Sequence, residues 1–469
     1  MAENKVTTAQ STPASIDECN ITSNSTGQSV SLLGGIINLT YYESLLQDTL
    51  MASVTFADAG DSIDGKSVSE GLPLENEEKV EIKIKDNNDV SLDLKFFVND
   101  NKKVGDETTK SLLVLDLVSQ EFIVNNKVRV SKRYDGQPSD TVTELLTDSL
   151  ATEKDIDIEE TSEPRNCFGG NRKPIYLINW LSQQSVPKTQ DAKGKTAGYF
   201  FYETSEGFKY KSIDSLFNQE KKKSIIYNET PDSRGANIPE GYDIKALSMQ
   251  KENRNNVTEK EEMGAYATRL ISFNPFNCQY DVATFSAEAF EGSYSLGGAA
   301  LPKGNPELKQ EGFNKNYTRT TYQIKDIGTM PSGSTSQQIE KSKEENFKVS
   351  DICNQAIMRY NQMFLSKIKV TIPGDFSLHA GDAVFFDAPS PQRDVKNDEV
   401  DRQIGGLYII AALCHYITRK ETYTNLVLVR DSFGRTGKAS TSPSSTSQSG
   451  TPAKPIKAPG VQSSAERRN

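Results

Sequence analysis

The side chains best suited to acid–base or nucleophilic chemistry are scarce in this sequence. There are two histidines, His379 and His415, and Cys414 is the neighbour of His415. A cysteine–histidine dyad needs both side chains on one face, whereas adjacent residues of a strand point to opposite faces. The residues around Cys414 alternate as in a strand, and His379 falls at a turn. We therefore interpret these residues as structural.

Sequence motifs for catalysis, nucleotide binding or metal binding are absent. No zinc-protease helix, nucleophile elbow, Walker A loop or dinucleotide glycine pattern occurs. Gly169-Gly170 followed by Arg172-Lys173 resembles a phosphate loop only in composition, because no strand leads into it. The polar turn Asp86–Asp89 lacks the twelve-residue pattern of a calcium loop. We therefore predict no catalytic residue, no cofactor and no metal ligand.

A carboxylate pair acting on a glycosidic bond remains an alternative, since the chain contains 64 aspartates and glutamates. So many acidic residues form pairs by chance, and the clusters Glu75–Glu78 and Asp155–Glu160 are typical of solvated loops. The aromatic run Tyr199–Tyr202 lacks the interleaved basic residues of a base-stacking platform. We expect its side chains in the core or in a subunit contact.

Composition indicates a large acidic protein with several domains. The 469 residues suffice for roughly two to four domains, each with its own core. A net charge of −10 gives no reason to expect sequence-specific binding of nucleic acid. No apolar run is long enough for an integral membrane segment, and residues 1–20 lack the features of a secretory signal. The five cysteines are far apart, so we expect reduced thiols.

Two β-rich regions form the predicted framework that would position any functional residues. The later one combines a helix with the periodicity of an amphipathic surface and four strands, over Asp351–Phe364, Lys367–Ile372, Ala383–Phe386, Leu407–Thr418 and Tyr423–Arg430. The earlier one contains an alternating hairpin and two further strands, over Val80–Lys85, Val90–Val98, Leu50–Phe56 and Leu112–Val118.

The sequence between these regions mixes helices and strands. Predicted helices occur within Tyr134–Leu150, from Pro174 onward, and at Ile244–Met249. A hairpin is predicted around Thr204–Gly207, and two more strands at Ala267–Ser272 and Tyr280–Phe285.

A weak internal repeat links the two β-rich regions. Leu74 is followed by Val80 and Ile82, and Leu378 is followed by Val384 and Phe386 at the same offsets. Any two hairpins can share three such positions, so the repeat alone leaves duplication and coincidence equally open.

The order of several short motifs resembles that of phage baseplate hub proteins. The hairpin that begins Gly198-Tyr-Phe-Phe-Tyr-Glu and the preceding Leu177-Ile-Asn-Trp-Leu181 are similar to the middle domain of that family. Pro373-Gly-Asp-Phe376, Gly381-Asp-Ala-Val384 and Gly406-Leu-Tyr-Ile-Ile410 resemble its last barrel. The resemblance covers roughly residues 30–435. The long terminal arms and the excursion at 291–336 depart from the compact family pattern.

This resemblance implies an α+β, β-dominated fold with two tube-like antiparallel β-barrel domains and a middle α+β domain. The implied boundaries are a flexible arm at 1–26, a first barrel at 27–131, a middle domain at 132–222 with part of 286–345, a second barrel at 223–285 and 346–435, and a flexible tail at 436–469.

The implied function is that of a structural, non-enzymatic hub in the virion, assembled in the host cytoplasm. A homotrimer would adapt the hexameric tail tube protein to the trimeric central spike protein and enclose the channel through which DNA is ejected. Baseplate wedge proteins and the tape measure protein are further implied partners. Two alternatives stay open at this stage, a peptidoglycan-degrading baseplate enzyme and a host glycan-binding adhesin.

Overall fold

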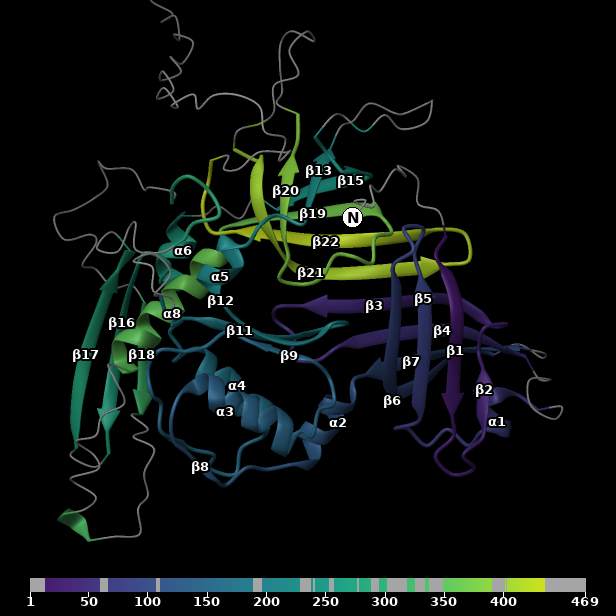
Figure 1. Ribbon diagram of the computed structural model, residues 1–469, viewed down its shortest axis with the longest axis horizontal. Helices are drawn as coiled ribbons and strands as arrows, with labels where there is room; N and C mark the ends of the chain where they lie inside the picture. The colour runs from purple at the N-terminus through teal and green to yellow at the C-terminus, as the bar shows by residue number, and fades with distance from the viewer. Residues whose placement is uncertain are drawn as a thin grey trace, which may run out of the picture.

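The computed structural model of the chain describes residues 13–59, 66–106, 110–188, 196–227, 238, 241–252, 257–275, 278–287, 295–301, 319–324, 334–336, 349–389, 401 and 403–434. Strands dominate, as the sequence predicted, and a sheet of 14 strands runs through most of the molecule. Figure 1 shows its two halves side by side, with the helical middle domain packed below one of them.

The first half of this sheet, here called the first unit, is built from residues 15–118. Its strands follow the spatial order β3-β4-β7-β6-β5-β1-β2. The elements are β1 (Ser15–Thr22), β2 (Ser29–Ser31), β3 (Ile36–Ser44), β4 (Met51–Ala59), the short helix α1 (Val68–Gly71), β5 (Lys79–Lys85), β6 (Ser91–Asp106) and β7 (Lys110–Val118).

The other half, the second unit, comes mainly from the C-terminal part of the chain. Its strands follow the order β15-β19-β22-β21-β20-β13-β14. The elements are β13 (Lys223–Tyr227), β14 (Ile244–Ala246), β15 (Ser248–Glu252), β19 (Ser366–Pro373), β20 (Ala383–Asp387), β21 (Gly406–Thr418) and β22 (Thr422–Arg430).

Alternation along the strands explains why both units fold as sheets with one buried face. In β5, Val80, Ile82 and Ile84 are completely buried, whereas the charged residues between them are partly exposed. β19 repeats the pattern with Ile368, Val370 and Ile372. Each such aliphatic side chain contributes about 1.5–3 kcal/mol on burial, which fixes the register of its strand.

The two units have the same topology. In chain order, β3, β4, β5, β6 and β7 correspond to β15, β19, β20, β21 and β22, and every neighbouring pair among them is antiparallel. The weak sequence repeat falls on corresponding strands, β5 and β20. The units differ at one border, because β1 lies antiparallel to β5 and β13 lies parallel to β20.

The correspondence extends to single residues. Val80 pairs with Phe96 on β6, and Val384 pairs with Tyr408 on β21. Further along, β6 carries a bulge between Val98 and Asp100. The bulge of β21 lies between Ile410 and Ala412, at the matching position. Two unrelated sheets would not share strand order, register and bulge position, so we infer that the units are copies of one ancestral unit.

Strand β21 joins the two units. Its first residues pair with β20, and from Ala412 to Thr418 the same side of the strand pairs with β3 of the first unit. Phe376 and Ile417 of the second unit lie in the hydrophobic core of the first. The units are therefore one continuous sheet with partly shared packing.

Closed barrels are not formed by the strand pairings of the described residues, although two barrels were predicted. The joint between β21 and β3 opens the two halves into one sheet. The nearest approach to closure is in the second unit. There β14 pairs with β13, and β15, which follows it directly, pairs with β19 on the opposite border.

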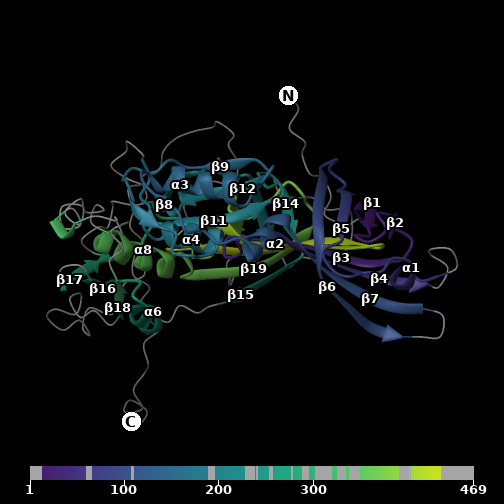
Figure 2. The same ribbon diagram turned by 90° about the horizontal axis from the view of Figure 1, so that it is seen from below.

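The middle domain packs around its own core of aromatic and aliphatic residues. Figure 2 shows its helices and short strands gathered on one side of the second unit. Pro174 starts helix α4, as expected from its fixed φ and missing N–H donor. The elements are α2 (Gln120–Lys127), β8 (Arg133–Tyr134), α3 (Pro138–Glu144), a π-helical turn (Leu145–Ser149), β9 (Ile156–Ile158), β10 (Cys167–Phe168), α4 (Pro174–Ser182), β11 (Tyr199–Thr204), β12 (Gly207–Ser212) and α5 (Ile213–Asn218).

A third layer is inserted between β15 and β19. Helix α8 packs on a separate sheet of three strands, with β16 in the centre. Its elements are α6 (Val257–Met263), β16 (Ala267–Asn274), β17 (Gln279–Ser286), β18 (Arg319–Ile324) and α8 (Val349–Met363).

Three sequence predictions need correction. Residues 15–22, assigned to the flexible arm 1–26, form β1, because pairing with β5 fixes a segment that is polar by composition. Ile244–Met249 was predicted as a helix but lies in β14 and β15, where pairing with β13 and β19 decides the conformation. Residues 257–286 belong to the inserted layer, not to the second unit. The tail 436–469 and most of 286–345 lie outside the described residues.

Candidate functional site: a polar junction of three parts

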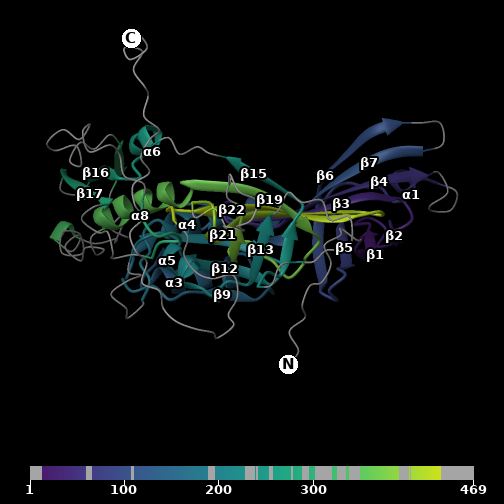
Figure 3. The same cartoon turned by 90° about the horizontal axis from the view of Figure 1, so that it is seen from above.

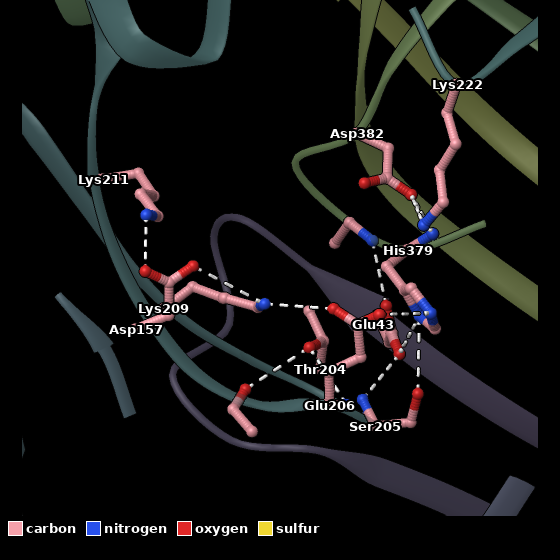
Figure 4. A network of polar contacts seen from close by, with 12 residues as sticks. Glu43, Asp157, Thr204, Ser205, Glu206, Lys209, Lys211, Lys222, His379 and Asp382 are labelled. Carbon is pink, nitrogen blue, oxygen red and sulfur yellow. Dashed lines mark hydrogen bonds and ion pairs between the residues drawn. The ribbon is translucent and has the colours of Figure 1, made fainter. Parts of the chain in front are cut away.

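Buried polar residues gather where the first unit, the middle domain and the second unit meet (Figure 4). Glu43 comes from β3 of the first unit, Ser205 from the turn between β11 and β12, and His379 from the turn before β20. Glu43 is 1% exposed and His379 6% exposed. Residues that are distant in the sequence thus form one desolvated cluster.

Glu43 is the centre of this junction. Its Oε1 accepts hydrogen bonds from the Tyr41 hydroxyl at 2.6 Å and from the Ser205 backbone N–H at 2.9 Å. Nδ1 of His379 lies 3.2 Å from the same oxygen. Oε2 accepts from the Ala380 backbone N–H at 2.9 Å. One carboxylate therefore ties together all three parts of the molecule, with both of its oxygens satisfied.

Glu43 and His379 hold each other in the charged state. Burial is the largest influence on the Glu43 carboxyl and favours its neutral form, but bonds from His379, Tyr41 and Ser205 outweigh it and lower the pKa. For His379, burial is the largest influence and disfavours the imidazolium. The hydrogen bond and the opposite charge of Glu43 outweigh burial, so the pKa of His379 is raised. The stability from His379 is lost as the pH rises through its raised pKa, and that from Glu43 as the pH falls through its lowered pKa. The pair therefore stabilises the junction most between about pH 4.5 and 6.5.

Serine, histidine and carboxylate are also the components of a hydrolase triad, but their geometry here excludes that role. In a triad the imidazole uses one nitrogen for the serine and the other for the carboxylate. Here Ser205 Oγ at 3.4 Å and Glu43 Oε1 at 3.2 Å both face Nδ1 of His379. Because Nδ1 donates its hydrogen to Glu43, it has no lone pair left to accept a proton from Ser205.

Ion pairs surround the junction on its more exposed side. Lys222 Nζ binds Asp382 Oδ2 at 2.9 Å, and the same carboxylate oxygen accepts from the His379 backbone N–H at 2.7 Å. Lys209 Nζ lies 3.0 Å from Glu206 Oε2 and 3.7 Å from Asp157. Each of these partly exposed ion pairs contributes little to the stability of the fold.

A second anchor connects the middle domain to the first unit. Glu203, at the end of β11, is buried and accepts a hydrogen bond from the Leu50 backbone N–H at 2.8 Å. Lys154 Nζ pairs with Glu203 and with Glu121, the latter at 2.6 Å. Buried carboxylates thus fix the middle domain to the first unit at two points, Glu203 near the end of β11 and Ser205 in the turn that follows.

His415 lies in the joint between β21 and β3, next to Tyr41 of the polar junction. Its ring stacks on Tyr41 with centroids 5.8 Å apart and contacts Phe376 edge-on at 4.8 Å. Nδ1 is 2.9 Å from the Thr424 hydroxyl. Burial disfavours the imidazolium and lowers the pKa of His415 to about 4. Cys414 faces the other side of the sheet, as the alternation predicted, so no dyad forms.

Replacing His415 with phenylalanine should remove part of the acid sensitivity of the fold. A buried histidine with a lowered pKa contributes stability above its ordinary value of 6.5 that is lost as the pH falls toward 4. The difference in unfolding free energy between pH 7 and pH 4 should therefore be about 3 kcal/mol smaller in the variant. Urea unfolding across this pH range measures it. Tyr416→Phe removes only a hydroxyl at the neighbouring position of the same strand and should keep the wild-type dependence, whereas equal slopes in all three proteins would contradict the assignment.

The sequence pointed to the two histidines but gave no direct indication of Glu43 or Glu203. The available signal was a charged residue on the buried face of a strand, such as Glu43 two positions after Tyr41. Within the described residues no group of three or more His, Cys, Asp and Glu side chains is arranged to hold a metal ion. No helix in the same ranges is long and apolar enough to span a membrane. The geometry supports a structural joint that holds the two units and the middle domain together.

Similarity to known proteins is found at the level of structure only. No protein-family model matches the sequence, and no curated protein matches it. A tail protein from Neisseria meningitidis is 9% identical, with a TM-score of 0.49 over 88% of this chain and 96% of that one. The 43 kDa tail protein of prophage MuSo2 from Shewanella oneidensis is 9% identical, with a TM-score of 0.47 over 88% and 98%.

A third similar structure is a component of the E. coli type VI secretion system, itself described as similar to T4 bacteriophage tail proteins. It is 8% identical, with a TM-score of 0.41 over 90% of this chain and 79% of that one.

Proposed function

We propose that this chain is the structural hub of a phage tail baseplate. Three copies form a ring that adapts the hexameric tail tube to the trimeric central spike and surrounds the channel for DNA. The chain acts by assembly and has no catalytic role. Each unit contributes its part of the sheet to the wall of the tube, and the protein is located in the virion baseplate.

The duplication carries this proposal. The two units share strand order, register and the position of a bulge, and they lie edge to edge in one sheet. A chain with two equivalent units gives six similar units when three chains form a closed ring. Such a ring matches sixfold symmetry on one face, while the single middle domain of each chain keeps threefold symmetry on the other.

The polar junction supports the same function. A hub must transmit force between tube and spike without bending between its domains. Glu43 ties the two units and the middle domain together, and Phe376 of the second unit fills the core of the first. Buried, fully hydrogen-bonded groups of this kind resist separation, because each would be left unsatisfied on opening. The partners proposed from this role are the spike, the tube protein, the wedge proteins and the tape measure protein.

Purified full-length chain should form a trimer. Light scattering should give three times the chain mass of 51.8 kDa, and negatively stained particles should average to rings with six outer lobes. A monomer or dimer at all concentrations, or particles without a central opening, would contradict the hub. Clearing of a peptidoglycan gel by the chain alone would favour the enzyme alternative instead.

A further inference from the structure

The joint between β3 and β21 shows how the two units pair, and the same kind of pairing is available between two copies of the chain. In this joint the outer side of β3 pairs with the part of β21 that extends beyond β20. Tyr42 lies opposite Cys414, and Tyr41 lies opposite His415. The first unit thus uses its β3 border, and the second unit uses its β21 border.

Each unit also has the border that the other unit uses in this joint, and among the described residues that border has no strand partner. Strand β6, the equivalent of β21, extends beyond β5 from Asp100 to Asp106 and pairs there with β7 alone. Strand β15, the equivalent of β3, pairs with β19 alone. We call these free sides the β6 edge and the β15 edge. Figure 3 shows that the ends of β6 and β7 project from the rest of the sheet.

The β6 edge is exposed in a way that an isolated protein normally avoids. Lys102, Lys103 and Gly105 are exposed, and Val104 is 63% exposed. A long unpaired strand presents free N–H and C=O groups and readily adds a strand from another chain. Since the first unit offers a β6 edge and the second a β15 edge, each chain carries both halves of one head-to-tail contact.

We propose that β15 of a second copy of this chain pairs antiparallel with the β6 edge and repeats the joint of β3 and β21. This inference rests on the proposed function, because three such seams close the ring of three chains. The matching of registers fixes the partners across the seam. In the known joint Tyr42 of β3 lies opposite Cys414 of β21. Lys102 takes the position of Cys414 in β6, and Glu252 takes the position of Tyr42 in β15, so Lys102 lies opposite Glu252 of the second copy. One position further, Lys103 lies opposite Lys251.

The charges give this register a signature. Within its own chain Lys102 Nζ lies 2.6 Å from Asp116 and 3.2 Å from Asp100. Across the seam Lys102 faces a further opposite charge, whereas Lys103 faces a like charge. Lys102→Glu should therefore weaken the trimer and Lys103→Glu should strengthen it, each by about two- to fivefold in the dissociation constant per seam. Sedimentation on dilution measures both. Opposite effects at adjacent residues support the register, and equal effects of either sign overturn it.

Disulfide trapping tests the seam directly. Residues opposite one another on antiparallel strands have Cα atoms about 4.5–5.5 Å apart, within the range that a disulfide spans. The full-length chain would carry Lys102→Cys and Glu252→Cys, with the exposed Cys278 changed to serine. Mild oxidation should give covalent trimers. The control, Lys102→Cys with Ser248→Cys, places the two thiols out of register and should stay uncrosslinked.

The outcomes separate this inference from the proposed function. A trimer by light scattering that does not crosslink, or crosslinks equally in the control, overturns the seam and leaves the hub intact. Crosslinked ladders that continue past three chains support the seam and overturn the closed ring. A monomer that never crosslinks overturns both.

Discussion

Replacing Arg359 with alanine should destabilise the folded chain by about 3–5 kcal/mol, since it leaves a buried carboxylate without its partner. Arg359 is completely buried on helix α8. Its Nη1 donates to Asp431 Oδ2 at 3.2 Å, just after β22, and its Nη2 donates to the Ser295 carbonyl at 3.1 Å. Asp214 of α5 lies 3.5 Å from the same guanidinium. This cluster fixes the inserted layer to the second unit and the middle domain.

Burial is the main influence on Asp431 and raises its pKa even with Arg359 present. Without the guanidinium the carboxylate must take up a proton or remain as an uncompensated buried charge. Urea unfolding followed by tryptophan fluorescence would measure the loss. Arg319→Ala, which removes an exposed arginine, should cost less than about 0.5 kcal/mol. Combining Arg359→Met with Asp431→Asn should recover most of the stability, and a loss below 1 kcal/mol for Arg359→Ala would refute the assignment.

Strands with regular alternation were predictable because one face of each is buried within its own unit. β5, β6, β19 and β22 are of this kind. Segments whose conformation depends on distant partners were not. β15 has no apolar alternation of its own. It forms a strand because its backbone pairs with β19.

The site residues escaped prediction for the same reason. Glu43 acquires its role from Ala380 and His379, more than 300 positions away in the chain. A buried charge is indistinguishable from a solvated one until its partners are known, and 64 acidic residues offer no way to select it. The duplication was only hinted at by three apolar positions. The inference rests on the shared register and on the shared position of the bulge, which can be compared only once the strand pairings are known.

Replacing Phe376 with alanine should cost about 3–5 kcal/mol and, in addition, separate the unfolding of the two units. Phe376 follows β19 in the second unit, but its ring is buried in the core of the first. Its backbone N–H donates to Asp86 Oδ2 at 2.9 Å, and its ring contacts His415. Truncation leaves a cavity at the joint, so the packing that couples the units is lost together with the buried area.

The matched control is Phe386→Ala, which removes the same side chain from the second unit's own core. Both variants should lose similar total stability. Calorimetry should resolve two transitions for Phe376→Ala and one for Phe386→Ala, because only the first weakens the contact between units. Hydrogen exchange should then show early opening of β3 and the far end of β21 in the Phe376 variant alone. A single transition in both would mean that the joint is held by strand pairing and the Glu43 network, with no contribution from the shared core.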